Sequence, residues 1–304
     1  MSHGADQNAV IVKAVQDNLS ESKQEIHGSD SNGKKYKTIT AMWLSQGVLQ
    51  KASSSKRSNS EDEIKNDEVG LCKSGRREWY SKSRDYWDDE DTCPATVNGM
   101  LGGFASISNI DLAASKQFLL DLASIRPALT FQSKEYTTCA VECGAGIGRV
   151  TKGLLLPLGL GRCDLVESSS RLLSQAPSYI GDAPSSQCRF LCVGLQDFEP
   201  KENTYDIIWI QWVIGYLTDA DCVDLFRRCG SSLRQPGGVI CIKDNTCTEE
   251  AFILDVDDAS VTRSLPYLLN LTKQAGLKVV FQRMQEDFPE DIFPVPMIAL
   301  DVDR

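Results

Sequence analysis

The stretch Val141-Glu142-Cys143-Gly144-Ala145-Gly146-Ile147-Gly148-Arg149 decides the fold of this chain of 304 residues. Its apolar first part predicts the end of a buried strand, and glycines at every second position follow. Glycines leave the backbone bare, so a ligand can lie against this turn at the carboxyl end of the strand, where open parallel sheets bind their ligands. The spacing differs from the Gly-x-Gly-x-x-Gly that seats a dinucleotide pyrophosphate, which disfavours nicotinamide binding.

Outward from this turn, apolar runs alternate with helical patterns. Runs at residues 139–143 and 163–166 enclose a helical stretch, and strand-helix-strand at this spacing indicates parallel strands. The last two strand candidates are separated by a loop alone, which predicts an antiparallel hairpin. We therefore predict an α/β fold with a mostly parallel twisted sheet, helices on both faces and an antiparallel C-terminal hairpin. The other strand candidates are residues 189–192, 205–210, 239–243, 277–282 and 295–300.

Two helices have clear boundary signals. Ser108-Asn109-Ile110-Asp111 has the spacing of a capping box, and it predicts the start of a helix that Pro127 ends. Residues 219–233 carry the clearest helical pattern, which ends before Pro236-Gly237-Gly238.

The first 75 residues differ in composition from the rest of the chain. They are rich in Ser, Lys, Asp, Glu and Asn, and such a segment buries too little apolar surface to offset its ordering entropy. We predict a disordered polar extension over residues 1–75 and a single domain over residues 76–304. Within the extension, the apolar residues of 39–49 predict either a short helix or a docking element for a partner.

The overall composition is that of a globular protein without a general affinity for nucleic acid. The net charge of −10 disfavours a nucleic-acid binder and suits a basic substrate, although excess acid can equally serve solubility alone. Eleven scattered cysteines without a Cys-x-x-Cys pair, and two histidines, indicate reduced thiols and no ordinary zinc site. Without a long apolar run or a secretory signal, we expect a cytoplasmic and nuclear protein that does not enter membranes.

Further segments narrow the ligand of the glycine turn. Glu167 ends the next predicted strand, where an acid can accept hydrogen bonds from both hydroxyls of an adenosine ribose. Gly194-Leu195-Gln196-Asp197-Phe198 follows the third strand and is placed to touch an adenine. Leu233-Arg234-Gln235-Pro236-Gly237-Gly238 is a structural turn from helix to strand. In this order the segments resemble a Class I (Rossmann-like) methyltransferase, which implies S-adenosylmethionine (AdoMet) as cofactor and no metal.

Two polar segments follow neighbouring strands at the same edge of the sheet. Trp209-Ile210-Gln211-Trp212 ends one strand, and Lys243-Asp244-Asn245 ends the next. Core packing explains Trp209, but Gln211, Trp212 and Asn245 lie past the strand bodies. We expect these side chains to face one crevice with the glycine turn.

Together with five more blocks, these segments closely resemble the eukaryotic protein α-N-terminal methyltransferases. That family acts on chains that begin X-Pro-Lys or X-Pro-Arg after loss of the initiator Met, with Ala, Ser or Pro as X. The resemblance covers nearly all of residues 77–304 and implies an N-terminal helical extension to the fold. The further blocks are residues 79–87, 99–104, 143–149, 194–198 and 253–263.

The resemblance implies a role for each matching site residue. The residues expected to bind AdoMet are Gly144, Gly146, Arg149, Glu167, Leu195, Gln196 and Gln211. The family usually has Asp where Glu167 stands, and a longer carboxylate can keep the ribose contact. The residues expected to line the peptide channel are Trp87, Leu101, Gly102 and Trp212, with Trp212 on the substrate's proline.

The remaining assignments concern the amine of the substrate. The resemblance implies that Asn245, Asp255 and Asp258 hold the substrate's N-terminus and its third-position Lys or Arg, with Asp258 as the base. Animal members carry a histidine where this chain has Tyr216, and a tyrosine of ordinary pKa near 10 is expected to be a hydrogen-bond partner in the substrate site instead of a base. Without the resemblance, the acids of 255–258 would be taken for a solvated loop.

These residue types suit the chemistry independently of the resemblance. Methyl transfer is an in-line displacement by a neutral amine, which the enzyme must deprotonate, desolvate and aim. An α-amino group has a pKa of about 7.7–8.0, against roughly 10.4 for lysine, so only the former is appreciably neutral at cellular pH. One nearby carboxylate can take the remaining proton, and a second can pair with the basic side chain that follows.

Two other functions remain open on the sequence. The same fold serves lysine and small-molecule N-methyltransferases, because fold alone does not choose the acceptor. A cofactor-binding interaction protein without turnover is the third reading. As partners we expect protein N-termini that begin X-Pro-Lys or X-Pro-Arg, no nucleic acid and no membrane, and we expect a monomer or a weak homodimer.

Overall fold

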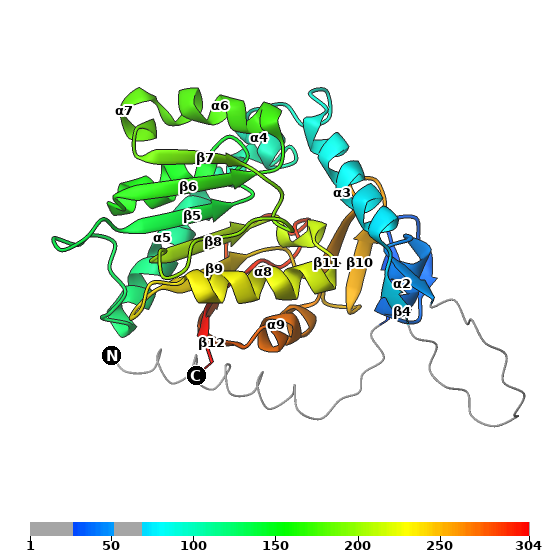
Figure 1. Cartoon of the computed structure of the whole chain (residues 1–304). Helices are drawn as coiled ribbons and strands as arrows, with labels where there is room; N and C mark the ends of the chain where they lie inside the picture. The colour runs from blue at the N-terminus through cyan, green and yellow to red at the C-terminus, as the bar shows by residue number, and fades with distance from the viewer. Residues whose placement is uncertain (1–26, 52–68, 304) are drawn as a thin grey trace, which may run out of the picture.

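A mostly parallel sheet forms the centre of the molecule in the computed structural model, which describes residues 27–51 and 69–303. Its seven strands lie in the order β12-β13-β9-β8-β5-β6-β7 (Figure 1). The strands from β9 to β7 are parallel, whereas β13 is antiparallel to both β9 and β12, which confirms the predicted C-terminal hairpin. The bounds are β5 Cys139–Cys143, β6 Arg162–Glu167, β7 Cys188–Cys192, β8 Ile207–Gln211, β9 Val239–Lys243, β12 Leu277–Met284 and β13 Pro296–Val302.

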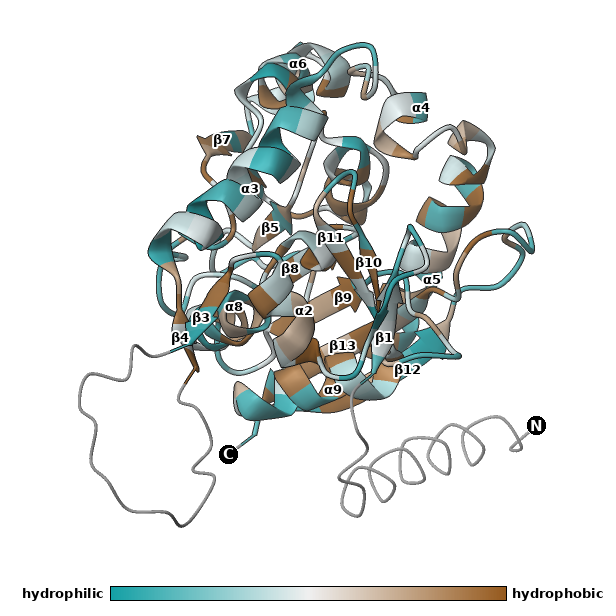
Figure 2. Cartoon of the chain, turned by 90° about the vertical axis from the view of Figure 1, so that its right-hand side faces the viewer, coloured by the Kyte–Doolittle hydropathy of each residue, from teal (hydrophilic) through white to brown (hydrophobic). Residues whose placement is uncertain are grey.

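Helices cover both faces of this sheet because its strands are apolar on both sides. On β8, Ile207 and Trp209 point into one hydrophobic core, while Ile208 and Ile210 point into the other. In Figure 2 the strand interiors are accordingly brown, the colour of hydrophobic residues. The first core includes residues of α5 (Ser108–Ile125), η2 (Thr151–Leu155), η3 (Leu156–Leu158) and α6 (Ser170–Ile180); the second includes residues of α8 (Asp219–Ser232) and α9 (Leu265–Gln274).

The start of α5 corrects one sequence prediction. The helix begins at Ser108 as expected, but the capping box is wrong, because Ser108 is the first helical residue and the preceding Ile107 caps without a side chain. Asp111 is instead fully buried and points into the protein. The Asp111 carboxylate does not take part in a capping box because buried cations from other elements of the protein compete for it.

Helix α3 (Lys73–Asp88) lies across the carboxyl edge of the parallel strands and is tied to α8 (Figure 1). Arg76 donates to both carboxylate oxygens of Asp221 at 2.7–3.2 Å, and the Tyr80 hydroxyl donates to Asp221 at 2.5 Å. The Trp79 indole donates to the carbonyl of Tyr216 at 2.7 Å. The short elements nearby are α4 (Val97–Met100), η1 (Ala105–Ile107), α7 (Asp182–Ser185) and η4 (Ile214–Tyr216).

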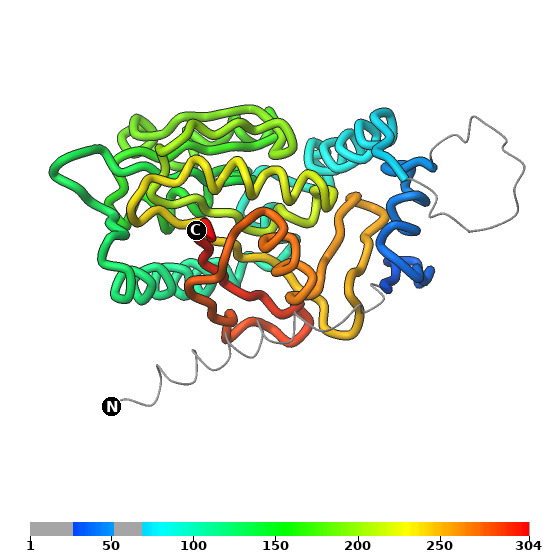
Figure 3. Tube along the Cα trace, turned by 60° about the horizontal axis from the view of Figure 1, so that its bottom comes forward, coloured from blue at the N-terminus to red at the C-terminus, as the bar shows by residue number. Residues whose placement is uncertain are grey.

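Part of the predicted N-terminal extension is folded onto this domain. Strands β1 (Gly28–Asp30) and β2 (Lys35–Tyr36) extend the hairpin of β10 (Phe252–Asp255) and β11 (Ser260–Arg263) into a sheet of order β11-β10-β1-β2. Figure 3 shows this segment, in blue, beside that hairpin. Its other elements are α2 (Ile39–Ser45) and β3 (Leu49–Lys51), and β3 pairs with β4 (Val69–Leu71).

The prediction of disorder for residues 1–75 is therefore wrong for residues 27–51 and 69–75. The expected short helix in 39–49 is confirmed as α2, and it packs within the chain. Trp43 is buried against Trp79 of α3, with ring centroids 4.9 Å apart in edge-to-face geometry. Composition underestimated this segment because only a few large side chains, Tyr36, Met42, Trp43 and Val48, form its buried part. Residues 1–26 and 52–68 lie outside the described residues.

Three further observations concern the cysteines, helices that could cross a membrane, and groups that could hold a metal. All eleven cysteines lie in the described part and are free thiols. Among residues 27–51 and 69–303, no helix is long and apolar enough to cross a membrane. In the same ranges, no group of three or more His, Cys, Asp and Glu side chains is placed to hold a metal ion.

We predict that Trp43→Ala destabilises the whole domain, because it removes a buried aromatic side chain that joins the N-terminal segment to α3. The expected loss in the free energy of unfolding is about 3–5 kcal/mol, measured by urea denaturation. Lys37→Ala, at an exposed position of the same segment, is the matched control and should change stability by less than about 0.5 kcal/mol. Equal stability of the two variants would contradict this packing role.

Candidate functional site

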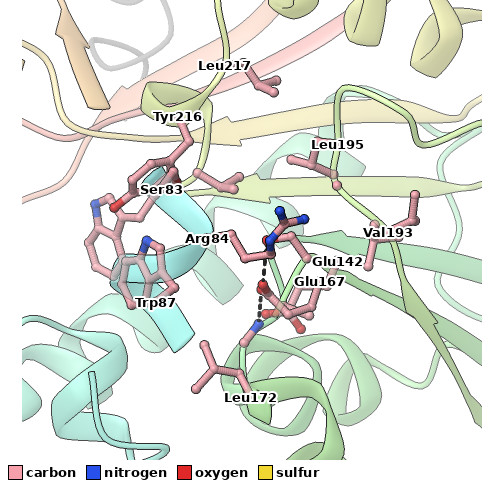
Figure 4. A pocket seen from close by; sticks show the side chains of 18 of the residues that line it. Ser83, Arg84, Trp87, Glu142, Glu167, Leu172, Val193, Leu195, Tyr216 and Leu217 are labelled. Atoms are coloured by element: carbon pink, nitrogen blue, oxygen red, sulfur yellow. Dashed lines mark hydrogen bonds between the residues drawn. The ribbon is translucent and has the colours of Figure 1, made fainter. Parts of the chain in front are cut away.

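A cavity of about 440 Å³ lies at the carboxyl ends of β5, β6, β7 and β8. At this edge the strand order reverses: from β5 the chain adds β6 and β7 on one side, and β8 and β9 on the other. Open α/β sheets bind their ligands at such a reversal. Helix α3 contributes Tyr80, Ser83, Arg84 and Trp87 to its wall. Figure 4 shows Trp87 together with Tyr216 on one side of the cavity, and Leu195 with Val193 on the other.

The glycine turn forms one wall of the cavity and has no room for side chains. Gly144 and Gly146 have φ angles of +70° and +53°, in the left-handed region that favours glycine. A Cβ at Gly144 would lie 2.6 Å from the Val213 side chain, and one at Gly146 would lie 2.6 Å from the Met100 sulfur. The turn is thus bare backbone held close to the cavity, which is the arrangement that the sequence predicted.

Glu167 ends β6 with a buried carboxylate in the same wall. Its oxygens accept hydrogen bonds from the backbone N–H groups of Gly146 at 2.9 Å and Ser169 at 2.8 Å. Burial raises the pKa of the Glu167 carboxyl, and these hydrogen bonds oppose the rise. The bonds fix the orientation of the carboxylate. Oε1 also accepts from the Ser168 hydroxyl at 3.2 Å, so Oε2 is the oxygen that keeps a lone pair for a ligand hydroxyl.

Glu142 is a second buried carboxylate in the cavity wall, and sequence analysis assigned it no role. It accepts hydrogen bonds from the Thr151 backbone N–H at 2.7 Å and the Thr151 hydroxyl at 2.6 Å. Burial raises the pKa of Glu142 to about 7, despite those hydrogen bonds. Its place inside an otherwise apolar strand was the available signal, because a charged residue in a buried strand rarely lacks a function.

A buried charge cluster lies behind the cavity and is centred on Asp111. Its carboxylate lies 2.5 Å from the Lys243 ammonium and 2.8 Å from the Arg149 guanidinium. It also accepts a hydrogen bond from the side-chain amide of Gln211 at 2.8 Å. Arg149 and Gln211 were predicted from the sequence as cofactor residues, but Asp111 was not, because its contacts come from elements distant in the chain.

Lys243 is fully buried in this cluster. Its ammonium also donates to the Ser115 hydroxyl at 2.9 Å and the Gln285 side chain at 2.7 Å. Burial lowers the pKa of Lys243, and Asp111 opposes that shift. Two cations share one carboxylate, and Arg149 faces the cavity, so this end of the cavity is electropositive and suits an anionic group.

Trp212 follows β8 in a backbone conformation that side chains rarely adopt, with φ of +50°. Its N–H still donates to the Lys243 carbonyl at 3.0 Å. Asp244 holds the next two residues, because one of its oxygens accepts from the N–H groups of Val213 at 3.0 Å and Ile214 at 3.1 Å. Such strain persists only where the surroundings over-determine it, and it is concentrated at functional sites.

The Trp212 ring lies between an electropositive and a polar neighbour. The Arg149 guanidinium lies over the ring, 5.6 Å from its centroid, and the indole N–H donates to Asn245 Oδ1 at 3.1 Å. The ring therefore presents an apolar surface to the cavity in a fixed orientation.

Tyr216 and Asp258 form a hydrogen-bonded pair beside the cavity. The Tyr216 hydroxyl donates to Asp258 Oδ2 at 3.0 Å, and the Tyr216 ring meets Trp87 edge to face at 5.9 Å. Burial, and then the Asp258 charge, raise the pKa of Tyr216 well above its ordinary value. Burial raises the pKa of Asp258, and the nearby Asp255 charge adds to it. The Ser260 hydroxyl and backbone N–H lie close enough to Asp258 to oppose this rise in pKa, although within the described chain the buried Oδ1 accepts no hydrogen bond of good geometry.

The structure brings most of the predicted site residues to this one cavity. Asn245 and Asp258 stand one hydrogen bond behind its wall, and Asp255 ends β10 at an exposed position. Leu101 and Gly102 are not among the lining residues, where their neighbour Met100 stands instead. The predicted residues that line the cavity are Trp87, Gly144, Gly146, Arg149, Glu167, Leu195, Gln196, Gln211, Trp212 and Tyr216.

Comparison with known proteins connects this cavity to one family. A sequence model of the AdoMet-dependent proline di-methyltransferases matches residues 75–301. The chain is 46% identical over 222 residues to N-terminal Xaa-Pro-Lys N-methyltransferase 1 of Danio rerio, covering 73% of this chain and 95% of that protein. It is 45% identical over 224 residues to the Bos taurus protein of the same name, covering 74% of this chain and 96% of that protein.

A solved structure extends the similarity over more of the chain. A SAM-dependent methyltransferase from Leishmania major superimposes with a TM-score of 0.73 at 33% sequence identity. The match covers 92% of this chain and 98% of that one. The predicted fold class is thereby confirmed.

We predict that Asp244→Asn removes part of the pH dependence of stability. Burial raises the pKa of Asp244 from 3.8 to about 6, so the folded chain binds this proton more tightly than the unfolded chain. The resulting stability is present below pH about 4 and is lost as the pH rises to about 6, by up to about 3 kcal/mol. Urea denaturation of both proteins at several pH values between about 4 and 7 measures the difference.

The wild type should lose stability relative to Asp244→Asn across that pH range. A difference between the two proteins that stays constant with pH would show that Asp244 does not titrate in this way.

Proposed function

Since this chain belongs to the family of AdoMet-dependent proline di-methyltransferases, we propose that it methylates the α-amino group of proteins that begin (Ala/Ser/Pro)-Pro-Lys or (Ala/Ser/Pro)-Pro-Arg. The chain is an AdoMet-dependent methyltransferase by family and by fold. One observation carries the choice of acceptor. The partly buried carboxylate of Asp258 accepts a hydrogen bond from Tyr216, which lines the same cavity as the glycine turn.

The residues of the cavity fit AdoMet. The bare backbone at Gly144 and Gly146 would lie against the nucleoside, and Glu167 would accept from the ribose hydroxyls. Leu195 and Gln196 would contact the adenine, while Arg149 and Gln211 would hold the amino-acid end of the cofactor at the electropositive end of the cavity. When bound, AdoMet supplies a methyl group on a positively charged sulfur, which is open to displacement by an amine.

Asp258 is suited to take a proton from the substrate's ammonium. An α-amino group with a pKa of about 7.7–8.0 is partly protonated at cellular pH, so a base must complete its deprotonation. The carboxylate of Asp258 is partly desolvated, which raises its pKa toward that of the amine and improves it as a base. Tyr216 donates to the other oxygen and orients the carboxylate, and its own raised pKa keeps it protonated.

The neighbouring residues supply selection of the peptide. The fixed Trp212 ring offers a flat apolar surface for a proline, and Asn245 lies beside it with a carbonyl oxygen that already accepts from the indole. Asp255 is exposed at the end of β10, where a lysine or arginine at the third substrate position can pair with it in solvent. Trp87 and Tyr216 close the side of the cavity opposite Leu195 (Figure 4).

The proposed activity is tested by mass spectrometry of a Ser-Pro-Lys peptide incubated with enzyme and AdoMet. We expect methyl groups on the α-nitrogen, little product from an N-acetylated peptide and little from a peptide with proline replaced. Fragment ions separate α-amine from lysine methylation. Equal methylation of the acetylated peptide would instead favour the lysine N-methyltransferase reading.

We predict that Asp258→Asn lowers kcat by about 100-fold or more, because it removes the general base. Tyr216→Phe should lower kcat by no more than about ten-fold, because it removes an orienting hydrogen bond. In the wild type, kcat/KM should fall at acid pH as Asp258 takes up a proton. The Tyr216 hydrogen bond lowers the pKa of Asp258, so this acid limb should move to higher pH in Tyr216→Phe.

Steady-state kinetics across pH, with AdoMet affinity measured separately, provide both readouts. Near-normal turnover of Asp258→Asn together with loss of activity in Tyr216→Phe would reverse the assignment of the base.

A further inference from the structure

The N-terminal segment is joined to the hairpin that leads into the substrate loop, residues 255–258. Strand β1 pairs in parallel with β10, with Gly28 opposite Phe252 and Asp30 opposite Leu254. The contact is close, because a Cβ at Gly28 would lie 2.3 Å from the Phe252 carbonyl oxygen. Glycine is therefore required where the two strands meet.

Ser31 continues this pairing into the substrate loop itself. Its backbone N–H donates to the Leu254 carbonyl at 2.8 Å, and its side-chain hydroxyl accepts from the Val256 N–H at 3.2 Å. Val256 lies between the two carboxylates assigned to the substrate, Asp255 and Asp258. Ser31 thus accepts from the Val256 N–H, a backbone donor of the loop. Strand β11, the other neighbour of β10, does not reach this donor.

Helix α3 holds the same loop from the opposite side. The Lys82 ammonium donates to the Val256 carbonyl. The backbone N–H and the carbonyl of Val256 are thus both hydrogen-bonded to other elements. The N-terminal segment is also fixed to α3 and α8, because Trp43 packs on Trp79 and its indole N–H donates to Asp219 at 2.9 Å. The segment therefore connects the loop that carries Asp258 with the helix that carries Trp87.

We propose that strand β1 and Ser31 support the substrate site from outside it, and that Ser31 is a positioning residue for the loop of Asp255 and Asp258. This inference rests on the proposed function of that loop. The family match begins at residue 75, so the segment lies outside the matched domain. Ser31 acts on the reaction only through the loop, since it lies on the exposed surface and does not line the cavity.

The physical basis is the conformational freedom of a short exposed turn. Asp255 and Asp257 are exposed, and within the turn the Asp257 N–H donates to the Asp255 carboxylate at 2.8 Å, so the backbone of Val256 depends on other elements for its hydrogen bonds. Without the Ser31 hydroxyl, the loop would occupy more conformations before it binds a peptide. The ordering would then take place at binding, which weakens peptide affinity and leaves the AdoMet site unchanged.

Ser31→Ala in the full chain tests this role directly. We expect hydrogen exchange at residues 252–258 to increase by about five-fold and KM for a Ser-Pro-Lys peptide to rise by about five-fold, the effect of one lost hydrogen bond. AdoMet affinity, kcat at saturating peptide and Tm should stay unchanged. Ser31→Thr retains the hydroxyl and should restore both exchange and KM.

The matched control is Ser45→Ala, which removes an exposed serine hydroxyl that bonds the Met42 carbonyl within the same segment. It should alter neither loop exchange nor KM. Gly28→Ala is the stronger variant, because its Cβ would push β1 from β10, and it should raise KM by more than Ser31→Ala does. Ser31→Ala decides the question even if Gly28→Ala fails to fold.

Unchanged exchange or unchanged KM in Ser31→Ala would overturn the inference. A parallel loss of Tm and AdoMet affinity would also overturn it, because it would indicate general destabilisation. Failure of the proposed function has a different signature, since the wild type would then methylate the N-acetylated peptide as well as the free one whatever happens at Ser31. Loss of activity in Asp258→Asn with no effect of Ser31→Ala would leave the function standing and remove only the positioning role.

Discussion

The cavity depends on one buried carboxylate, that of Asp111. It pairs with Arg149 after the glycine turn, with Lys243 at the end of β9 and with Gln211 at the end of β8. Desolvation of these groups is costly, and removal of one partner from such a cluster typically costs about 3–5 kcal/mol, because a buried charge is left unpaired. The elements that bind the cofactor are therefore locked to one another before any ligand is present.

The same cluster is connected, through the backbone at the end of β9, to the residues proposed to hold the acceptor. Lys243 accepts the N–H of Trp212 with its carbonyl, and Asp244 holds the N–H groups that follow. Trp212 is thereby kept in a left-handed conformation with its ring between Arg149 and Asn245. The ends of the cavity that we propose for the cofactor and for the peptide are thus parts of one hydrogen-bonded unit, which suits an in-line transfer that tolerates little misalignment.

Much of the fold followed from local signals. Apolar runs bounded by glycine and proline placed the strands of the main sheet, and the alternation of strands with helical patterns predicted its parallel order. The segment 27–51 was misjudged because its polar composition hid Trp43 and Tyr36, whose burial depends on Trp79 and Phe252 in later elements of the chain. Likewise Asp111 matched a helix cap by spacing, and only distant cations drew it inward.

By itself, then, the sequence determined the sheet, the glycine turn with Glu167, and the family whose motifs the chain carries, because these depend on short-range pattern and spacing. The tertiary structure alone decided which of them meet. It placed the Asp258 carboxylate against Tyr216 and set Ser31 on the loop beside it. The physical reason is that burial, pairing and pKa arise from groups far apart in the chain, which no local pattern records.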